Sequence, residues 1–145
     1  RRRRKQGVRE ISLGIEDAET GTMVFVTLHS SSAAKTIDRV IDVFPAAEKA
    51  MVRSMLSESL AAVISQNLMK KVGGGRCAAH EIMLCTPAIR NLIREDKVAQ
   101  MYSAIQTGGL LGMQTLDQCL KNLLEQSMIT KEAAQEKAKI PADFM

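Results

Sequence analysis

Aromatic side chains are scarce in this 145-residue chain, which has no tryptophan and is only 3% Phe, Trp and Tyr. Hydrophobic residues still make up 46% and charged residues 25%, so disorder along the whole chain is excluded. The core must therefore be built from aliphatic side chains and the nine methionines. A chain of this length fits one domain, or a piece of a larger one.

Long apolar runs are also missing. No segment has the roughly 18 consecutive apolar residues of a membrane-spanning helix, so we expect no membrane insertion. The basic N-terminus is not followed by the apolar stretch of a signal peptide. Together these absences predict an intracellular protein.

Cysteine and histidine are too few and too scattered to suggest a metal site. The three cysteines, Cys77, Cys85 and Cys119, form no CxxC pair, and an odd number favours reduced, packed thiols. The two histidines, His29 and His80, lie far apart in the sequence. A zinc site would need ligands to converge from unrelated segments, so we expect no metal.

The net charge of +4 is concentrated at one end of the chain. Six basic and no acidic residues lie in the first nine positions, namely Arg1, Arg2, Arg3, Arg4, Lys5 and Arg9. We expect residues 1–7 to form a solvated, disordered end. The alternative is a basic arm that contacts nucleic acid or anionic lipid by charge alone. Because no aromatic residues alternate with these charges, we expect no specific nucleic-acid partner.

The first half of the chain predicts helices around one buried strand. Apolar residues at helical spacing indicate helices over 8–19, 33–43 and roughly 46–59. Residues 22–28 are apolar and β-branched without alternation, as in a strand that is buried on both faces. His29 follows this strand at its carboxyl end, where ligands bind in α/β sheets.

The second half predicts a hairpin followed by helices. Strands over 62–71 and 76–85 flank a turn at Gly73–Gly75. This glycine run is no phosphate loop, because no Lys-Ser/Thr follows it and it opens no helix. Thr86 and Pro87 are a typical helix start, and the predicted helices cover 88–95, about 97–106, 115–126 and 131–138. One strand and one hairpin do not make a stable sheet, which indicates a piece of a larger α/β domain.

Two motifs carry a resemblance to a known family. TLHSSSAAKTIDRVIDVFP at 27–45 resembles the His box, and AIRNLIRE at 88–95 resembles the signature of retraction motors. Over roughly residues 17–144 the chain is similar to the carboxyl half of the type IV pilus retraction (twitching motility) ATPases, the PilT family of the secretion ATPase superfamily.

The resemblance implies a partial RecA-like P-loop NTPase fold. Residues 8–86 would be the carboxyl part of the ATPase core, 87–140 a C-terminal helical region, and 141–145 a tail. Complete family members bind ATP and magnesium. They form cytoplasmic homohexamers at the inner-membrane base of the pilus machine and act on its platform protein.

The sequence contains no GxxxxGK(S/T) phosphate loop and no recognisable Walker B strand. We therefore expect no nucleotide cofactor and no ATP hydrolysis for this chain alone. Two hypotheses follow: a part of a retraction motor subunit, or a catalytically inactive interaction module. The module would dock on full-length motor subunits or on the pilus platform.

The candidate site residues come from the two motifs. The resemblance places His29 near the terminal phosphate of the nucleotide, where an imidazole can donate a hydrogen bond; the alternative is a histidine that only caps a strand end. His80 is expected to be a structural strand residue, with Glu81 on the opposite face.

The second motif implies a motor-coupling helix. In it Ile89, Leu92 and Ile93 would pack, while polar side chains would make contacts that change between nucleotide states. Periodicity alone also allows a plain amphipathic helix with solvated arginines. The residues concerned are Ala88, Ile89, Arg90, Asn91, Leu92, Ile93, Arg94 and Glu95.

Overall fold

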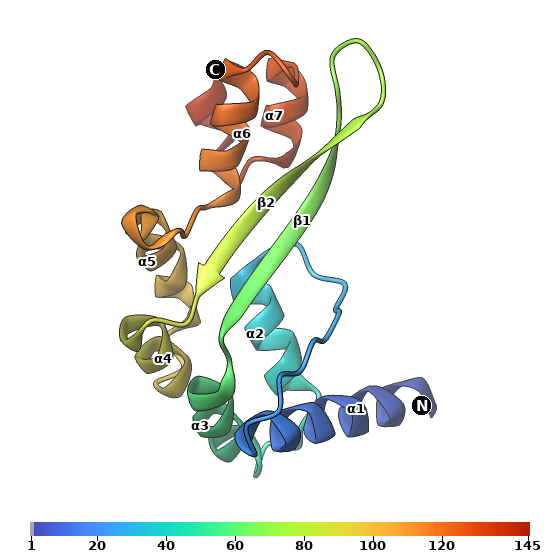
Figure 1. Ribbon diagram of the computed structural model, residues 1–145, viewed down its shortest axis with the longest axis vertical. Coiled ribbons are helices and arrows are strands. Elements are labelled where there is room, and N and C mark those ends of the chain that lie inside the picture. Colours follow the sequence, from blue (N-terminus) through green and yellow to red (C-terminus); the bar gives the residue numbers. More distant parts are fainter. Residues whose placement is uncertain (1) are drawn as a thin grey trace.

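The computed structural model describes residues 2–145, with side chains from residue 9 onward. A long hairpin runs through the molecule, with helices packed along it (Figure 1). In chain order the elements are α1 (Arg2–Glu19), α2 (Ala33–Asp42), α3 (Lys49–Ser59), β1 (Ala62–Lys70), β2 (Arg76–Leu84), α4 (Pro87–Arg94), η1 (Val98–Gln100), α5 (Met101–Thr107), η2 (Gly109–Leu111), α6 (Leu116–Glu125), α7 (Lys131–Lys137) and η3 (Pro141–Phe144).

The predicted hairpin is confirmed. β1 and β2 pair antiparallel from Ala62 opposite Leu84 to Lys70 opposite Arg76. The turn between them needs glycine, because Gly73, Gly74 and Gly75 have φ angles of 83°, 107° and 78°. Side chains along β1 point alternately inward and outward, and the outward ones, such as Ile64 and Leu68, are largely exposed.

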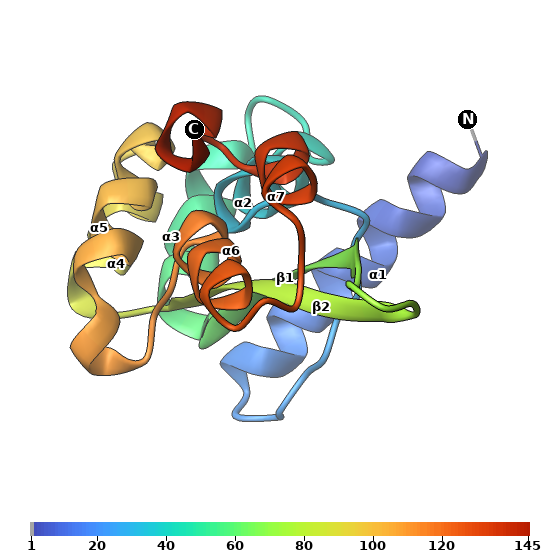
Figure 2. The same cartoon turned by 90° about the horizontal axis from the view of Figure 1, so that it is seen from above.

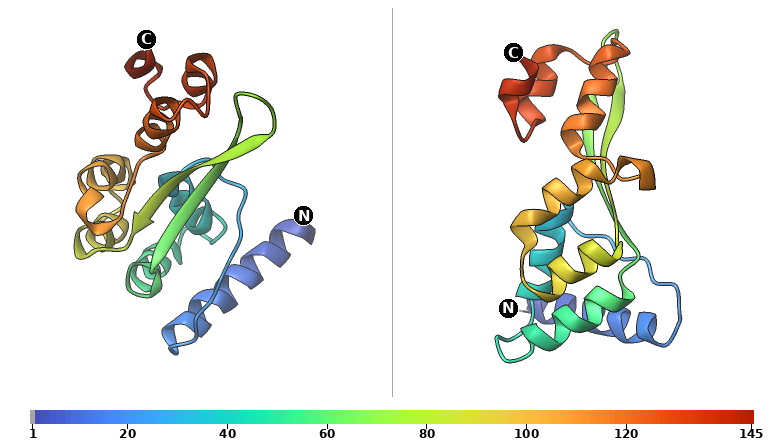
Figure 3. Two further views of the ribbon diagram at one scale, coloured as in Figure 1. Left: turned by 45° about the horizontal axis from the view of Figure 1, so that its top comes forward. Right: turned by 90° about the vertical axis from the view of Figure 1, so that its left-hand side faces the viewer.

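The inward face of the hairpin contributes to two separate hydrophobic cores. The half of the hairpin away from the turn packs with α2, α3, α4 and α5 through Val63 and Met83. The half near the turn packs with α6, α7 and η3 through Met69 and Ala79. Seen from above, α4 and α5 lie on the side away from the hairpin turn (Figure 2), and α1 lies at the opposite end from α6 and α7 (Figure 3). The helices after residue 87 are therefore divided between the cores: α4 and α5 belong to the first, and α6 and α7 belong to the second.

Most predicted helices are confirmed because their starts are encoded locally. The Thr86 hydroxyl accepts the Ile89 backbone N–H at 3.4 Å, and Pro87 is the first helical residue of α4. Side chains of Ser32, Thr115 and Thr130 cap α2, α6 and α7 in the same way. Two boundaries differ: α3 begins at Lys49 after a turn, and the helix predicted at 97–106 divides into η1 and α5.

The strand predicted at 22–28 is wrong. This segment has no regular secondary structure and joins no ladder with β1 or β2. Several of its apolar side chains are exposed, with Phe25 at 89% and Met23 at 80% of full accessibility, whereas Leu28 packs partly against the first core. A strand exists only through hydrogen bonds to neighbouring strands, and the described chain offers none here.

The two ends are more ordered than we predicted. The backbone of residues 2–7 continues α1 instead of forming a disordered end, and Arg1 lies outside the described residues. Arg, Lys and Gln are good helix formers, so the helix predicted at 8–19 extends back through them even though Gly7, a residue type common at helix starts, lies between. Residues 141–144 form η3 instead of a free tail, because Phe144 is buried in the second core. Among the described residues, no helix has the length and apolar character to cross a membrane.

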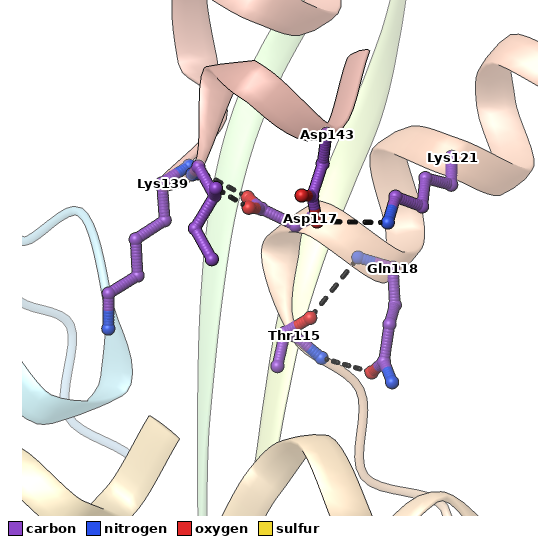
Figure 4. Close-up of polar contacts among 7 residues, drawn as sticks. Thr115, Asp117, Gln118, Lys121, Lys139 and Asp143 are labelled. Carbon is purple, nitrogen blue, oxygen red and sulfur yellow. Dashed lines mark hydrogen bonds and ion pairs between the residues drawn. The ribbon is translucent and has the colours of Figure 1, made fainter. Parts of the chain in front are cut away.

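Asp117 fastens the C-terminal segment to α6 (Figure 4). Its carboxylate is 3% exposed and accepts the backbone N–H groups of Lys139 and Ile140 at 2.8 and 2.9 Å. An exposed ion pair adds to this contact, in which Lys121 Nζ lies 3.1 Å from Asp143 Oδ2. The buried carboxylate is the stronger contact, because exposed ion pairs contribute little to stability.

Replacing Asp117 by Asn should lower the free energy of unfolding by about 1–3 kcal/mol, because an amide nitrogen cannot accept a backbone N–H. Urea denaturation of the chain measures this loss. Asp143→Asn is the matched control, since it removes only an exposed ion pair and should cost less than about 1 kcal/mol. Equal losses in the two variants would contradict this account of the C-terminal segment.

Candidate functional site

The loop before α2 presents the strongest candidate site. His29 is exposed there and lines an open depression of about 450 Å³ together with Ser30, Ser31, Lys35 and Arg39. The Arg39 guanidinium donates to the His29 carbonyl oxygen, and Lys35 Nζ donates to Ser31 Oγ at 3.2 Å. These contacts hold the loop against the first turns of α2.

The depression suits an anion. Lys35 and Arg39 carry positive charge beside an imidazole and two hydroxyls, and neither cation has an ion-pair partner within the described part of the chain. Charge-assisted hydrogen bonds from such groups are the usual contacts of phosphate oxygens. The structure thus gives His29 neighbours that could share a phosphate with it.

Glu81 is a buried residue whose contacts our sequence analysis did not anticipate. It is 4% exposed, and its Oε1 accepts the Ala33 backbone N–H at the start of α2 at 2.8 Å. The signal was present in the alternation of β2, where a carboxylate falls between Ala79 and Met83 on the apolar face. By contrast, His80 lies on the other face and its Nε2 is 3.1 Å from Gln66 Oε1, directly opposite on β1.

The AIRNLIRE helix, α4, buries the side chains that we assigned to packing. Ile89 and Ile93 are fully buried in the first core, and Leu92 packs partly against it. Ala88 and Asn91 are exposed at the surface. The helix therefore has one buried face and one polar face, as its periodicity predicted.

Arg90 is not a solvated side chain. Its Nη1 donates to the backbone carbonyls of Ser57 and Glu58 at 2.5 and 2.6 Å, in the last turn of α3. A cation at this position satisfies free carbonyls and suits the negative end of the helix dipole. Arg94 reaches Ser57 Oγ at only 3.5 Å. The polar contacts of the motif with α3 therefore come mainly from Arg90, beside the apolar packing of Ile89 and Ile93.

Glu95 ends the motif at the surface. Its pKa is lowered by hydrogen bonds from Lys97 and Asn91, with a further contribution from the Lys97 charge. The pairing with Lys97 is an exposed contact at 2.6 Å. No hydrogen bond or ion pair within residues 9–145 joins this helix to the His29 loop, so the two motifs form separate sites.

The cysteines do not add a third site. Cys77, Cys85 and Cys119 are free thiols, and within the described chain no group of three His, Cys, Asp or Glu side chains could hold a metal ion. Burial raises the pKa of Cys85 to about 11, which the nearby Arg90 charge opposes in part. A thiol with so high a pKa is a poor nucleophile near neutral pH.

Arg90→Ala should lower the free energy of unfolding by about 1.5–3 kcal/mol, because two carbonyls at the end of α3 lose a charged donor. Arg94→Ala is the matched control from the same helix. Since Arg94 is exposed and makes one long contact, its loss should stay within about 0.5 kcal/mol. Urea denaturation compares the two, and a larger loss for Arg94→Ala would refute the assignment of Arg90 to the end of α3.

Comparison with known proteins identifies relatives over most of the chain. It is 75% identical over 134 residues to the type IV pilus retraction ATPase PilT of Pseudomonas aeruginosa, a match that covers 92% of this chain and 39% of that protein. It is 60% identical over 129 residues to a twitching motility protein of Neisseria gonorrhoeae, which covers 88% of this chain and 34% of that protein. The chain thus spans little more than a third of the length of these relatives.

The fold agrees with these matches. The crystal structure of the pilus retraction motor PilT with bound ADP is similar at a TM-score of 0.82 and 43% identity, over 92% of this chain and 37% of that chain. The expected α/β class, as part of a larger ATPase domain, is confirmed. The model of the Type II/IV secretion system protein family matches residues 6–82, more than half of the chain. The chain therefore belongs to the Type II/IV secretion system protein family and resembles the carboxyl part of its PilT retraction ATPases.

Proposed function

We propose that this chain is the carboxyl part of a type IV pilus retraction ATPase subunit. The observation that carries the proposal is the 75% identity over 134 residues to a protein named as such a motor. Both motifs that we linked to retraction lie inside that match, which covers 92% of the chain. In the complete subunit, ATP hydrolysis would be coupled to pilus retraction.

In this proposal the His29 loop senses the nucleotide. The imidazole donates a hydrogen bond to the terminal phosphate, and Lys35 and Arg39 attract the same negative charge. ATP and magnesium are the cofactors of the complete subunit. Because the sequence holds no GxxxxGK(S/T) loop, the remaining phosphate and magnesium contacts come from residues outside this segment.

The AIRNLIRE helix transmits motion in this proposal. Arg90 joins α4 to the end of α3, so that the two helices move as one unit. Asn91, Arg94 and Glu95 are exposed, and in this proposal their surface contacts, including the Glu95–Lys97 ion pair, differ between nucleotide states. Such contacts would be formed within a homohexamer, at the cytoplasmic base of the pilus machine and against its inner-membrane platform protein.

A second candidate function is a catalytically inactive interaction module. The observation that favours it is the exposed apolar segment at 22–28, with Met23, Phe25 and Val26 at 80%, 89% and 56% accessibility. Apolar surface of this kind marks a binding face. The segment would then dock on full-length motor subunits or on the pilus platform without hydrolysing ATP.

The test is a chimera in which this chain replaces the matching segment of Pseudomonas aeruginosa PilT. The chimera should restore twitching to a strain that lacks PilT, and His29→Ala in the chimera should abolish that rescue. The isolated chain should show no ATP hydrolysis above background, because it lacks the phosphate loop.

Glu125→Ala is the control for His29→Ala, since Glu125 is exposed on α6 and does not line the depression; it should leave the rescue intact. A chimera that forms hexamers but neither hydrolyses ATP nor restores twitching would contradict the motor proposal. If the isolated chain then binds full-length motor subunits, the interaction module is the better description.

A further inference from the structure

Glu81 is a buried carboxylate that neither of the two motifs includes. It lies in the middle of β2, is 4% exposed, and faces away from solvent between the hairpin and the helices. None of the ion pairs within the described chain involves it. A buried carboxylate without a cation is costly unless other groups satisfy both of its oxygens.

Two helix N-termini contact those oxygens, α2 by a short hydrogen bond and α6 by a long one. Glu81 Oε1 accepts the backbone N–H of Ala33 at 2.8 Å, and Oε2 accepts that of Leu116 at 3.5 Å. Ala33 is the first residue of α2 and Leu116 is the first residue of α6. Helix N-termini carry free donors and partial positive charge, so the carboxylate is compensated from both sides. One side chain therefore joins three elements that are remote in sequence.

The two helices reach different parts of the proposed machinery. Ala33 follows the His29 loop directly, and Arg39 on the same helix binds the His29 carbonyl. On the other side, α6 carries Asp117, which fastens the C-terminal segment. A displacement of α6 relative to the hairpin would therefore pull on the carboxylate that orients α2.

We propose that Glu81 is a positioning residue that couples the His29 loop to the C-terminal helices. Its carboxylate accepts one hydrogen bond from each helix, so that α2 and α6 are both held to β2. The bridge itself follows from the contacts of this chain, whereas its effect on nucleotide turnover rests on the proposed function of His29. Two experiments separate these parts.

The first experiment measures amide hydrogen exchange in this chain with Glu81→Gln. Since the amide group of Gln can accept on one side only, the Ala33 and Leu116 amides should not both stay protected, and we expect at least one to exchange about tenfold faster. Glu81→Asp keeps the charge but shortens the reach, so the Leu116 amide, with the longer bond, should lose protection first.

Glu125→Gln is the matched control, because Glu125 is exposed on α6 and none of the hydrogen bonds or ion pairs described for this chain involves it. It should leave both amides unchanged. Unchanged exchange of both amides in Glu81→Gln and Glu81→Asp would overturn the bridge. Global unfolding of both variants would overturn the positioning role and assign Glu81 to stability alone.

The second experiment is a double-mutant cycle in the PilT chimera. Glu81→Gln should lower kcat for ATP about tenfold and change KM less than about threefold, because it displaces a sensing group without removing a binding contact. In a His29→Ala background the same change should lower kcat less than about twofold, since both act through one group. If Glu81→Gln lowers kcat by the same factor with and without His29→Ala, the two residues act independently and the coupling is overturned. If the unmutated chimera has no ATPase activity, the proposed function fails, and the exchange experiment alone decides the bridge.

Discussion

The arrangement of this chain depends on one buried carboxylate and the helix ends around it. Glu81 has no cation to compensate its charge in the described structure, so the N-termini of α2 and α6 must face it. Ser32 and Thr115 cap the two helices locally, and Glu81 accepts one backbone N–H from the first residue of each helix. Through Glu81 the hairpin contacts two helices whose first residues, Ala33 and Leu116, lie 83 positions apart in the sequence.

The hairpin gives that carboxylate a rigid position. Its inward face is apolar on both sides of Glu81, and each side belongs to a different hydrophobic core. The first core includes the AIRNLIRE helix and the second includes the C-terminal segment. Glu81 therefore lies close to the junction of the two cores, where a relative movement of the helices has to be accommodated. The outward face of the hairpin, with Ile64 and Leu68 exposed, takes no part in either core.

The two motifs use their polar residues differently. Around His29 the charged side chains of Lys35 and Arg39 line an open depression, and this leaves their charge available to a ligand. In AIRNLIRE, Arg90 is instead engaged with the carbonyls of α3, while the rest of the polar face stays open. One site is thus suited to binding an anion, and the other to passing displacement between packed helices. The two sites still share the first hydrophobic core, to which both α2 and α4 contribute buried side chains.

Local features of this protein were predictable from the sequence alone. The Thr86-Pro87 start of α4 and the glycine turn depend on neighbouring residues and are confirmed, and the helical periodicities predicted most helices, although the segment at 97–106 divides into η1 and α5. Tertiary structure decided the rest. Residues 22–28 have a strand composition but no partner strand, Phe144 orders the end through the second core, and Arg90 finds carbonyls of another helix. The contacts of Glu81 could not be predicted either. Its partners are the first residues of two helices that are remote in sequence, and a local sequence pattern does not show which remote segments meet in the fold.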